Sequence, residues 1–261
     1  MNKESLFSGA VLLISGGILL AMAPDKLSMM IIGVMLVLMV LGFFLSVVPS
    51  LSFNKGFLNA VRFIRDTKRV QSSNMWVTVS HTDALFRNDT LDGLFNDYKE
   101  KIRRRAKESS RSLYDVTDVI NEFTLETKTW QRLCSQIPSM LTALGILGTF
   151  MGLISGISAI RFSSVDVAVE GVQTLLNGIG TAFYTSVAGV ILSLVYTVVT
   201  KFTWNLMLQS MDRFYHDYHM YVSDPAEVRD KLLRNMNVRD ILDRLDKLIS
   251  LQRTGDYADE E

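Results

Sequence analysis

Four long stretches of the sequence carry no Asp, Glu, Lys or Arg, and they constrain the fold more than any other feature. They run over residues 5–24, 27–54, 133–160 and 171–200. A helix needs about 20 mostly apolar residues to cross the hydrocarbon core of a bilayer, so each stretch is long enough to span it. The sequence therefore predicts an all-α, polytopic membrane protein with four transmembrane helices.

The connections between the predicted spans indicate how the chain is organised. Only Pro24, Asp25 and Lys26 separate the first two spans, which predicts a helical hairpin, and a second span so close by argues against a cleaved signal peptide. The last three windows exceed the bilayer thickness, so their helices are expected to tilt or to run past the membrane surface. The expected parts are an N-terminal hairpin at 1–50, a cytoplasmic helical domain at 51–132, spans three and four at 133–200 with a short outward loop at 161–170, and a cytoplasmic helical tail at 201–261.

Positive charges predict the orientation. Residues 51–132 hold 15 Lys and Arg and the chain after Thr200 holds nine, whereas the loops at 24–26 and 161–170 hold one each. Short segments rich in Lys and Arg stay in the cytoplasm. We therefore expect both termini and both large segments to be cytoplasmic. That the membrane is a bacterial inner membrane is implied only by the family resemblance described below.

The cytoplasmic segments predict mostly helix. Residues 90–136 have helical spacing throughout and are expected to form a long helix that continues into span three. Residues 76–86 are ambiguous, either strand-like or irregular. After Pro225, apolar residues at steps of three and four between Val238 and Ile249 indicate a short amphipathic helix that suits self-association.

Polar residues in these segments point to no catalytic or metal chemistry. The Arg103–Arg105 run is interpreted as a solvated helix face rather than a nucleic-acid site, because acidic residues are mixed into it. His216 and His219 have no third ligand nearby and are expected to be surface residues. Cys134 is expected to be a buried thiol. No enzyme activity and no cofactor are predicted.

Spans three and four each carry a stripe of small residues on one helical face. The stripe of span three has Gly148 beside it, and Ser186 lies beside Thr185 in span four. Such faces allow helix backbones to approach closely, so helix packing alone could account for them. The stripes are Thr142, Gly145, Thr149, Gly152 and Gly156 in span three, and Gly178, Ala182, Thr185, Gly189 and Ser193 in span four.

The hydroxyls on these stripes suggest a second interpretation. Thr149, Thr185 and Ser186 lie near the middle of spans that contain no ionisable side chain. A hydroxyl at bilayer depth can bind a protonated carboxyl or hold water for it, but it does not carry a proton itself. If the stripe lines an ion path, another chain must supply the titrating carboxylate, which would need a polar companion in the membrane.

Two short motifs resemble a known family. The sequences GILGTFMGL (145–153) and GTAFYTSVAGVIL (180–192) are similar to the two signature spans of the MotA/TolQ/ExbB proton-channel family. The layout of a hairpin, a cytoplasmic domain, two long helices and a tail resembles the four-span flagellar stator branch. The sequence AFYTS at 182–186 also resembles the A component of the Zorya anti-phage system, which carries a very long helical tail.

The resemblance implies roles for particular residues. Thr149 occupies the threonine of the family's glycine-rich motif in the penultimate span. In the last span Ala182 and Gly189 match the family pattern, and Ser186 stands where the family has a threonine that faces the partner's aspartate. The proline that follows this glycine in the family is missing here. The resemblance thus implies ion-path hydroxyls at Thr149, Ser186 and Thr185, and pore-facing small residues at Gly145, Gly148, Gly152, Gly156, Ala182 and Gly189.

Family members form homopentamers around a dimer of a single-span protein that bears the aspartate. By resemblance, this chain is expected to be the pore-ring subunit of a membrane motor driven by H⁺ or Na⁺, in contact with lipids and with a possible cytoplasmic effector. The process that it powers could be motility, outer-membrane transport, gliding or defence. The alternative is a non-conducting membrane scaffold whose glycine stripes serve only helix packing.

Overall fold

The computed structural model describes residues 3–70, 75–107, 115–158 and 165–222, together with Leu242 and Leu245. The elements in these residues are helical, which confirms the predicted all-α class. The chain divides into two compact units, the first made of residues 1–55 and 122–211 and the second of residues 56–121 and 212–261. The amphipathic helix predicted after Pro225 and residues 161–164 of the outward loop lie outside the described residues, apart from Leu242 and Leu245.

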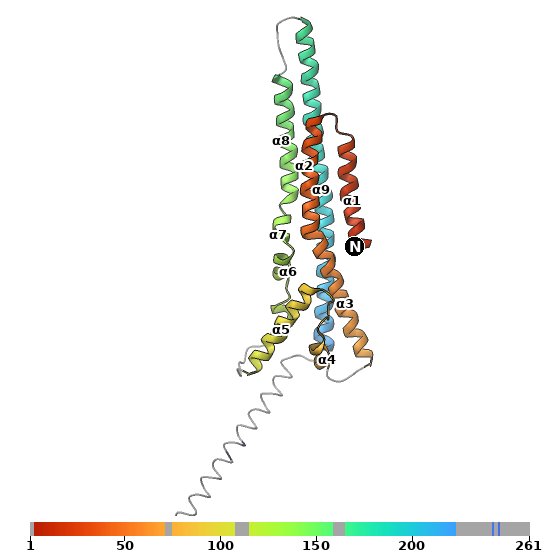
Figure 1. The fold of residues 1–261 in the computed structure, drawn as a ribbon, viewed down its shortest axis with the longest axis vertical. Coiled ribbons are helices and arrows are strands. Elements are labelled where there is room, and N and C mark those ends of the chain that lie inside the picture. Colours follow the sequence, from red (N-terminus) through yellow and green to blue (C-terminus); the bar gives the residue numbers. More distant parts are fainter. Residues whose placement is uncertain are drawn as a thin grey trace, which may run out of the picture. The chain divides into compact units, whose positions relative to one another are not determined.

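The N-terminal hairpin consists of α1 (Lys3–Ala21) and α2 (Lys26–Gly42), which lie side by side (Figure 1). Asp25 begins α2 from an extended backbone conformation. Its carboxylate accepts a hydrogen bond from the Ser28 N–H at 3.1 Å. This N-cap satisfies one of the backbone donors that the first turn of a helix leaves unpaired.

Three described helical segments are long and apolar enough to cross a membrane. They are Lys26–Val70, Gln131–Ser158 and Val167–Tyr221. The N-terminal helix contributes a shorter apolar stretch, Leu6–Ala21. Three candidate spans therefore agree with the predicted membrane protein, and a fourth span in α1 stays a prediction.

A π-helical turn, Phe43–Val47, joins α2 to α3 (Val48–Val70). Pro49 is the second residue after this turn. Proline has no N–H to donate and its ring clashes with the carbonyl four residues earlier. Widening the backbone into a π-turn at this point lets the helix continue past the proline. The continuous segment Lys26–Val70 has 45 residues, so it extends beyond a bilayer as predicted.

The second unit contains α4 (Met75–His81) and α5 (Asp89–Lys107). The ambiguous segment at 76–86 is helical as far as His81 and irregular after it. Met75 and Val79, one helical turn apart, are both buried. The rings at the centre of this unit have centroids 5.0–6.4 Å apart and come from Phe57, Phe86, Phe95, Tyr98, Phe214 and Tyr218.

The prediction of one long helix from residue 90 into span three is wrong. After α5 the described chain forms a 3₁₀ turn (Val116–Asp118), then α6 (Glu122–Lys128) and α7 (Gln131–Cys134). Asp115 caps the 3₁₀ turn and starts a new segment. Trp130 has a φ of 52°, in the left-handed region, so α6 cannot continue through it. The apolar spacing is helical on both sides of these breaks, which conceals them in the sequence.

The membrane part ends with α8 (Ile137–Ser158) and α9 (Val165–Tyr221). Pro138, at the second residue of α8, lies where its missing N–H removes no intrahelical bond. The 57 residues of α9 extend for about 85 Å, far more than the roughly 30 Å hydrocarbon core. The prediction that span four is part of a helix longer than a bilayer is thick is therefore confirmed, and its course past the membrane surface stays a prediction.

Candidate functional site

The small residues of α8 and α9 face each other within one chain. Gly145, Gly148, Gly152 and Gly156 are all buried. A Cβ atom placed on Gly152 would lie 2.7 Å from the Gly178 carbonyl oxygen, and one on Gly178 would lie 2.5 Å from the Gly152 carbonyl oxygen. Both distances are far below ordinary van der Waals contact. The two backbones therefore touch, and any side chain larger than hydrogen would separate them.

This close contact continues along the helix pair. A Cβ on Gly145 would meet the Thr185 carbonyl oxygen at 3.1 Å, and one on Gly189 would meet the Leu141 carbonyl oxygen at 2.8 Å. Ala182 is buried in the same contact. Packing within the chain thus accounts for the small size of the six residues named as pore-facing. Their pore-facing role stays a prediction.

Thr149 links the two helices by a hydrogen bond. Its hydroxyl is 3.1 Å from the Gly145 carbonyl oxygen of its own helix and 3.2 Å from the Ala182 carbonyl oxygen of α9. The side chain is half-buried. Thr149 therefore lies on the α8–α9 contact, and its hydroxyl proton is already directed at carbonyl groups of this chain. Its role in an ion path stays a prediction.

Thr185 is fully buried in the same contact. Its hydroxyl donates to the carbonyl oxygens of Thr181 and Ala182, at 3.0 and 3.1 Å. A Cβ on Gly148 would lie 2.5 Å from this hydroxyl oxygen, so a glycine is needed opposite it. Thr185 thus packs between the helices of one chain, and its role in an ion path stays a prediction.

Ser186 differs from the two threonines. Its side chain is half-buried, and within the described part of the chain no group forms a hydrogen bond with its hydroxyl. Its Cα lies close to α8, 3.3 Å from where a Cβ of Gly145 would be. Of the three predicted hydroxyls, the Ser186 hydroxyl is therefore the one that can still donate a hydrogen bond to another molecule and accept one from it.

The structure adds a polar group that the sequence reading did not single out. Thr181, one turn before Thr185, donates a hydrogen bond from its hydroxyl to the Asp25 carboxylate at 3.0 Å. The two residues line a hollow of about 430 Å³ with Ser155, Thr174 and Asn177. Thr181 precedes Thr185 by four residues and so shares its helical face, and Asp25 is the acidic residue between the first two spans. The sequence therefore offered a reason to single out each of the two residues.

The environment of Asp25 keeps it charged. Partial burial raises the pKa of its carboxyl, but hydrogen bonds from Ser28 and Thr181 outweigh this effect and hold the pKa below its ordinary value. At neutral pH the hollow therefore contains a negative charge.

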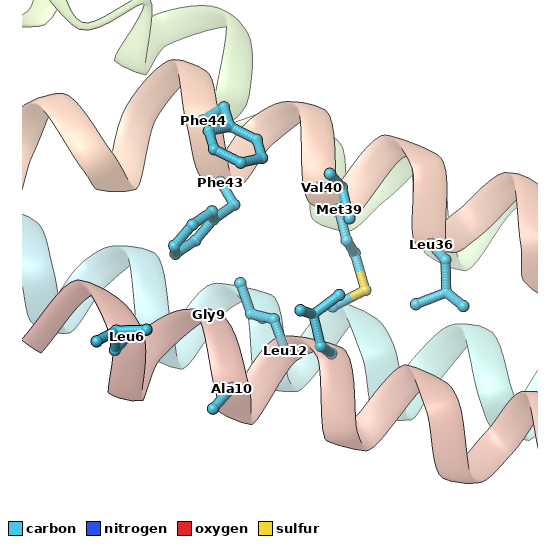
Figure 2. A pocket seen from close by; sticks show the side chains of 10 residues that line it. Leu6, Gly9, Ala10, Leu12, Leu36, Met39, Val40, Phe43 and Phe44 are labelled. Atoms are coloured by element: carbon cyan, nitrogen blue, oxygen red, sulfur yellow. The ribbon is translucent and has the colours of Figure 1, made fainter. Parts of the chain in front are cut away.

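A second hollow in the first unit has a different character. It measures about 260 Å³ and lies between α1 and α2 (Figure 2). Its walls are side chains such as Leu12, Met39 and Phe43, with almost no polar surface. An apolar hollow of this kind offers no group that could bind an ion.

Polar contacts in the second unit serve its packing. Asp217 is 2% exposed and forms an ion pair with Arg65 at 2.5 Å, which joins α3 to α9. His219 pairs with Asp115 at 2.9 Å, while His216 is exposed as predicted. Among the described residues, no group of three or more His, Cys, Asp or Glu could hold a metal ion. In the first unit, Cys134 is buried, as predicted.

Much of the apolar surface of α8 and α9 is left open. Phe150 and Phe183 are 60% and 70% exposed, and only about a third of the apolar windows of these helices is buried inside the chain. Such surfaces require lipid tails or other protein chains around them.

Comparisons with known proteins agree with this arrangement. Residues 18–221 match the family described as anti-phage protein ZorA of the Zorya type I system. Two relatives are Zorya proteins ZorA from Escherichia coli. One, from strain Crooks, is 37% identical over 65 residues, which are 25% of this chain and 11% of the relative. The other, from strain O139:H28, is 24% identical over 179 residues, which are 60% of this chain and 24% of the relative. The chain therefore spans a quarter or less of these relatives.

Proposed function

Because this chain belongs to the ZorA family of type I Zorya anti-phage systems, we propose that it is the pore-ring subunit of an ion-driven membrane motor used in defence. The predicted resemblance to the A component of the Zorya system is thereby confirmed. The proposal places five copies in the inner membrane, with both termini in the cytoplasm, around two copies of a single-span protein that supplies an aspartate. The transported ion would be H⁺ or Na⁺.

The observation that carries this proposal is the state of Ser186. It is a hydroxyl in a membrane helix, half-buried, and without a hydrogen-bond partner in the described residues. A polar group left unpaired in a hydrocarbon environment costs free energy, so it is expected to meet a polar group of another molecule. A protonated carboxyl is a suitable partner because it can both donate to the hydroxyl and accept from it.

The hydrogen bonds of Thr149 and Ser186 support different roles for these two of the three predicted hydroxyls. Thr149 holds α8 and α9 together through the Ala182 carbonyl, whereas Ser186 is free to respond to the partner. In this mechanism, an ion loads onto the partner's aspartate, and each loading event changes which copy's Ser186 the carboxyl meets. The large open apolar surfaces of α8 and α9 leave room for neighbouring copies.

Ion flux into proteoliposomes tests the proposal. Ser186→Ala removes one oxygen without adding bulk, so we expect flux at background level with the complex still assembled. Thr197→Val is the matched control, because the Thr197 hydroxyl bonds to the Ser193 carbonyl of its own helix at 2.8 Å. We expect this control to retain the flux of the unmodified protein. Unchanged flux in Ser186→Ala would contradict the assignment.

The non-conducting scaffold remains the second candidate, because the glycines are buried between two helices of one chain. Native mass spectrometry of the complex, extracted from its own membranes with its co-purifying proteins, distinguishes the two. Five copies with two of a single-span protein would support the motor. A dimer or trimer without such a protein would support the scaffold.

A further inference from the structure

The hollow beside Asp25 is lined by several side chains with hydroxyl, amide or carboxylate groups. Pro24 and Asp25 come from the hairpin turn, Leu27 from the start of α2, Gly152 and Ser155 from α8, and six residues between 174 and 181 from α9. Ser155, Thr174, Asn177 and Thr181 give it hydroxyl and amide groups around one carboxylate. The hollow between α1 and α2 in Figure 2 lies in the same unit but is lined by apolar side chains, so a polar lining is not a general feature of this unit's hollows.

The Asp25 carboxylate is held in place but is not saturated. One oxygen accepts from the Ser28 N–H at 3.1 Å, and the other accepts from the Thr181 hydroxyl at 3.0 Å. An ionised carboxylate offers about four acceptor positions in total, so about two remain. Oxygen ligands of this kind suit small, hard cations.

The hollow lies about one to two helical turns along α9 from the hydroxyl groups that α8 and α9 bring together. The Thr181 carbonyl accepts from the Thr185 hydroxyl, and the next carbonyl, that of Ala182, accepts from both Thr185 and Thr149. Gly152 lines the hollow and lies three residues, about 4.5 Å along the axis, beyond Thr149. Asp25 therefore stands at one end of a line of polar groups that reaches the level of Ser186.

We propose that the hollow at Asp25 is the outward loading site of the ion path, where a small monovalent cation is captured before it reaches Ser186. This inference rests on the proposed function and on the orientation proposed with it. Asp25 supplies the negative charge, Thr181 fixes the carboxylate, and the neighbouring hydroxyl and amide groups replace part of the hydration shell of the cation. Asp25 acts in capture, and the partner's aspartate acts in transfer.

The test measures flux through the purified complex in proteoliposomes while the outward H⁺ or Na⁺ concentration is varied. Asp25→Asn removes the charge but keeps the N-cap, because an asparagine oxygen also accepts from the Ser28 N–H. One unit charge acting at about 4 Å in an aqueous setting changes binding about fivefold. We expect the half-saturating cation concentration to rise by about this factor, with the maximal flux unchanged.

Glu170→Gln is the matched control. Glu170 is an exposed carboxylate on α9 that does not line the hollow, so its removal lowers the negative charge of the same end of the helix pair. We expect no shift in half-saturation. Equal shifts in both variants, or a lower maximal flux without a shift in Asp25→Asn, would overturn the capture site while leaving the motor intact. No current in the unmodified complex with either cation would overturn the proposed function, and the capture site with it.

Discussion

The contact between α8 and α9 gives a quantitative prediction for Gly178→Ala. The added Cβ would lie 2.5 Å from the Gly152 carbonyl oxygen and 2.8 Å from the Gly156 Cα. These are backbone atoms, so no side chain can rotate away. The helices would have to separate by about 0.9 Å to regain ordinary contact, and a gap of this size forfeits roughly a quarter to a half of the dispersion energy across it.

The net effect follows from two opposing terms. Overpacking of this kind typically costs about 1–3 kcal/mol, and here the upper part of that range applies because backbone must move. Replacing glycine by alanine inside a helix recovers about 1 kcal/mol of helix propensity. We therefore expect Gly178→Ala to lower the free energy of unfolding by about 1–2 kcal/mol.

Gly180→Ala is the matched control, since it lies two residues away on α9 and its Cβ would meet nothing within 4 Å. It should leave the free energy of unfolding unchanged or raise it by up to about 1 kcal/mol. Unfolding of the detergent-solubilised protein, titrated with SDS and followed by tryptophan fluorescence, compares the two variants. Equal stabilities would refute the conclusion that α8 and α9 touch through their backbones at this point.

Two further predictions concern the second unit. Asp217→Asn should lower the free energy of unfolding by about 1–2 kcal/mol, because the buried amide replaces a carboxylate that accepts a charge-assisted hydrogen bond from Arg65. The control is Asp212→Asn, an exposed position on the same helix, which should be nearly neutral in the same denaturation assay. Partial burial raises the pKa of Asp115, but hydrogen bonds from Thr117, His219 and the Val116 N–H outweigh it and hold the pKa below its ordinary value. A depressed folded-state pKa contributes stability that is present above the unfolded value of 3.8 and is lost as the pH falls through the folded value. Thermal unfolding between pH 3 and 6 should therefore show an acid decline that is weaker in Asp115→Asn, and identical profiles would contradict this.

The sequence was most informative where one physical requirement dominated. The absence of charge over residues 27–54, 133–160 and 171–200 identified the three long apolar helices, because a bilayer excludes charged side chains from its core. The two stripes, with Gly145 and Gly152 in span three and Gly178 in span four, likewise indicated close helix packing, and the structure shows that they pack against each other. Periodicity on a helix shows which residues share a face, but it does not show whether the neighbour belongs to the same chain.

The sequence was least informative where local geometry decided the outcome. The break between α6 and α7 depends on Trp130 in a left-handed conformation, which tryptophan rarely adopts and which no spacing rule reveals. The pairing of Asp25 with Thr181 joins residues 156 positions apart, so it follows from the tertiary fold and from no local pattern. For the same reason the distinct states of Thr149 and Ser186 could not be separated before their partners were known.

Backbone contact between α8 and α9 also has a mechanical consequence. Glycine facing glycine leaves no intervening layer of flexible side chains, so sliding or rocking of one helix on the other would drive main-chain atoms into each other. The two helices are therefore expected to move together as one rigid unit. If the proposed ring forms, each helix pair would move as a whole, and deformation would concentrate at the contacts between neighbouring subunits. The exposed Phe150 and Phe183 belong to the surface that is open to lipid tails or to other chains.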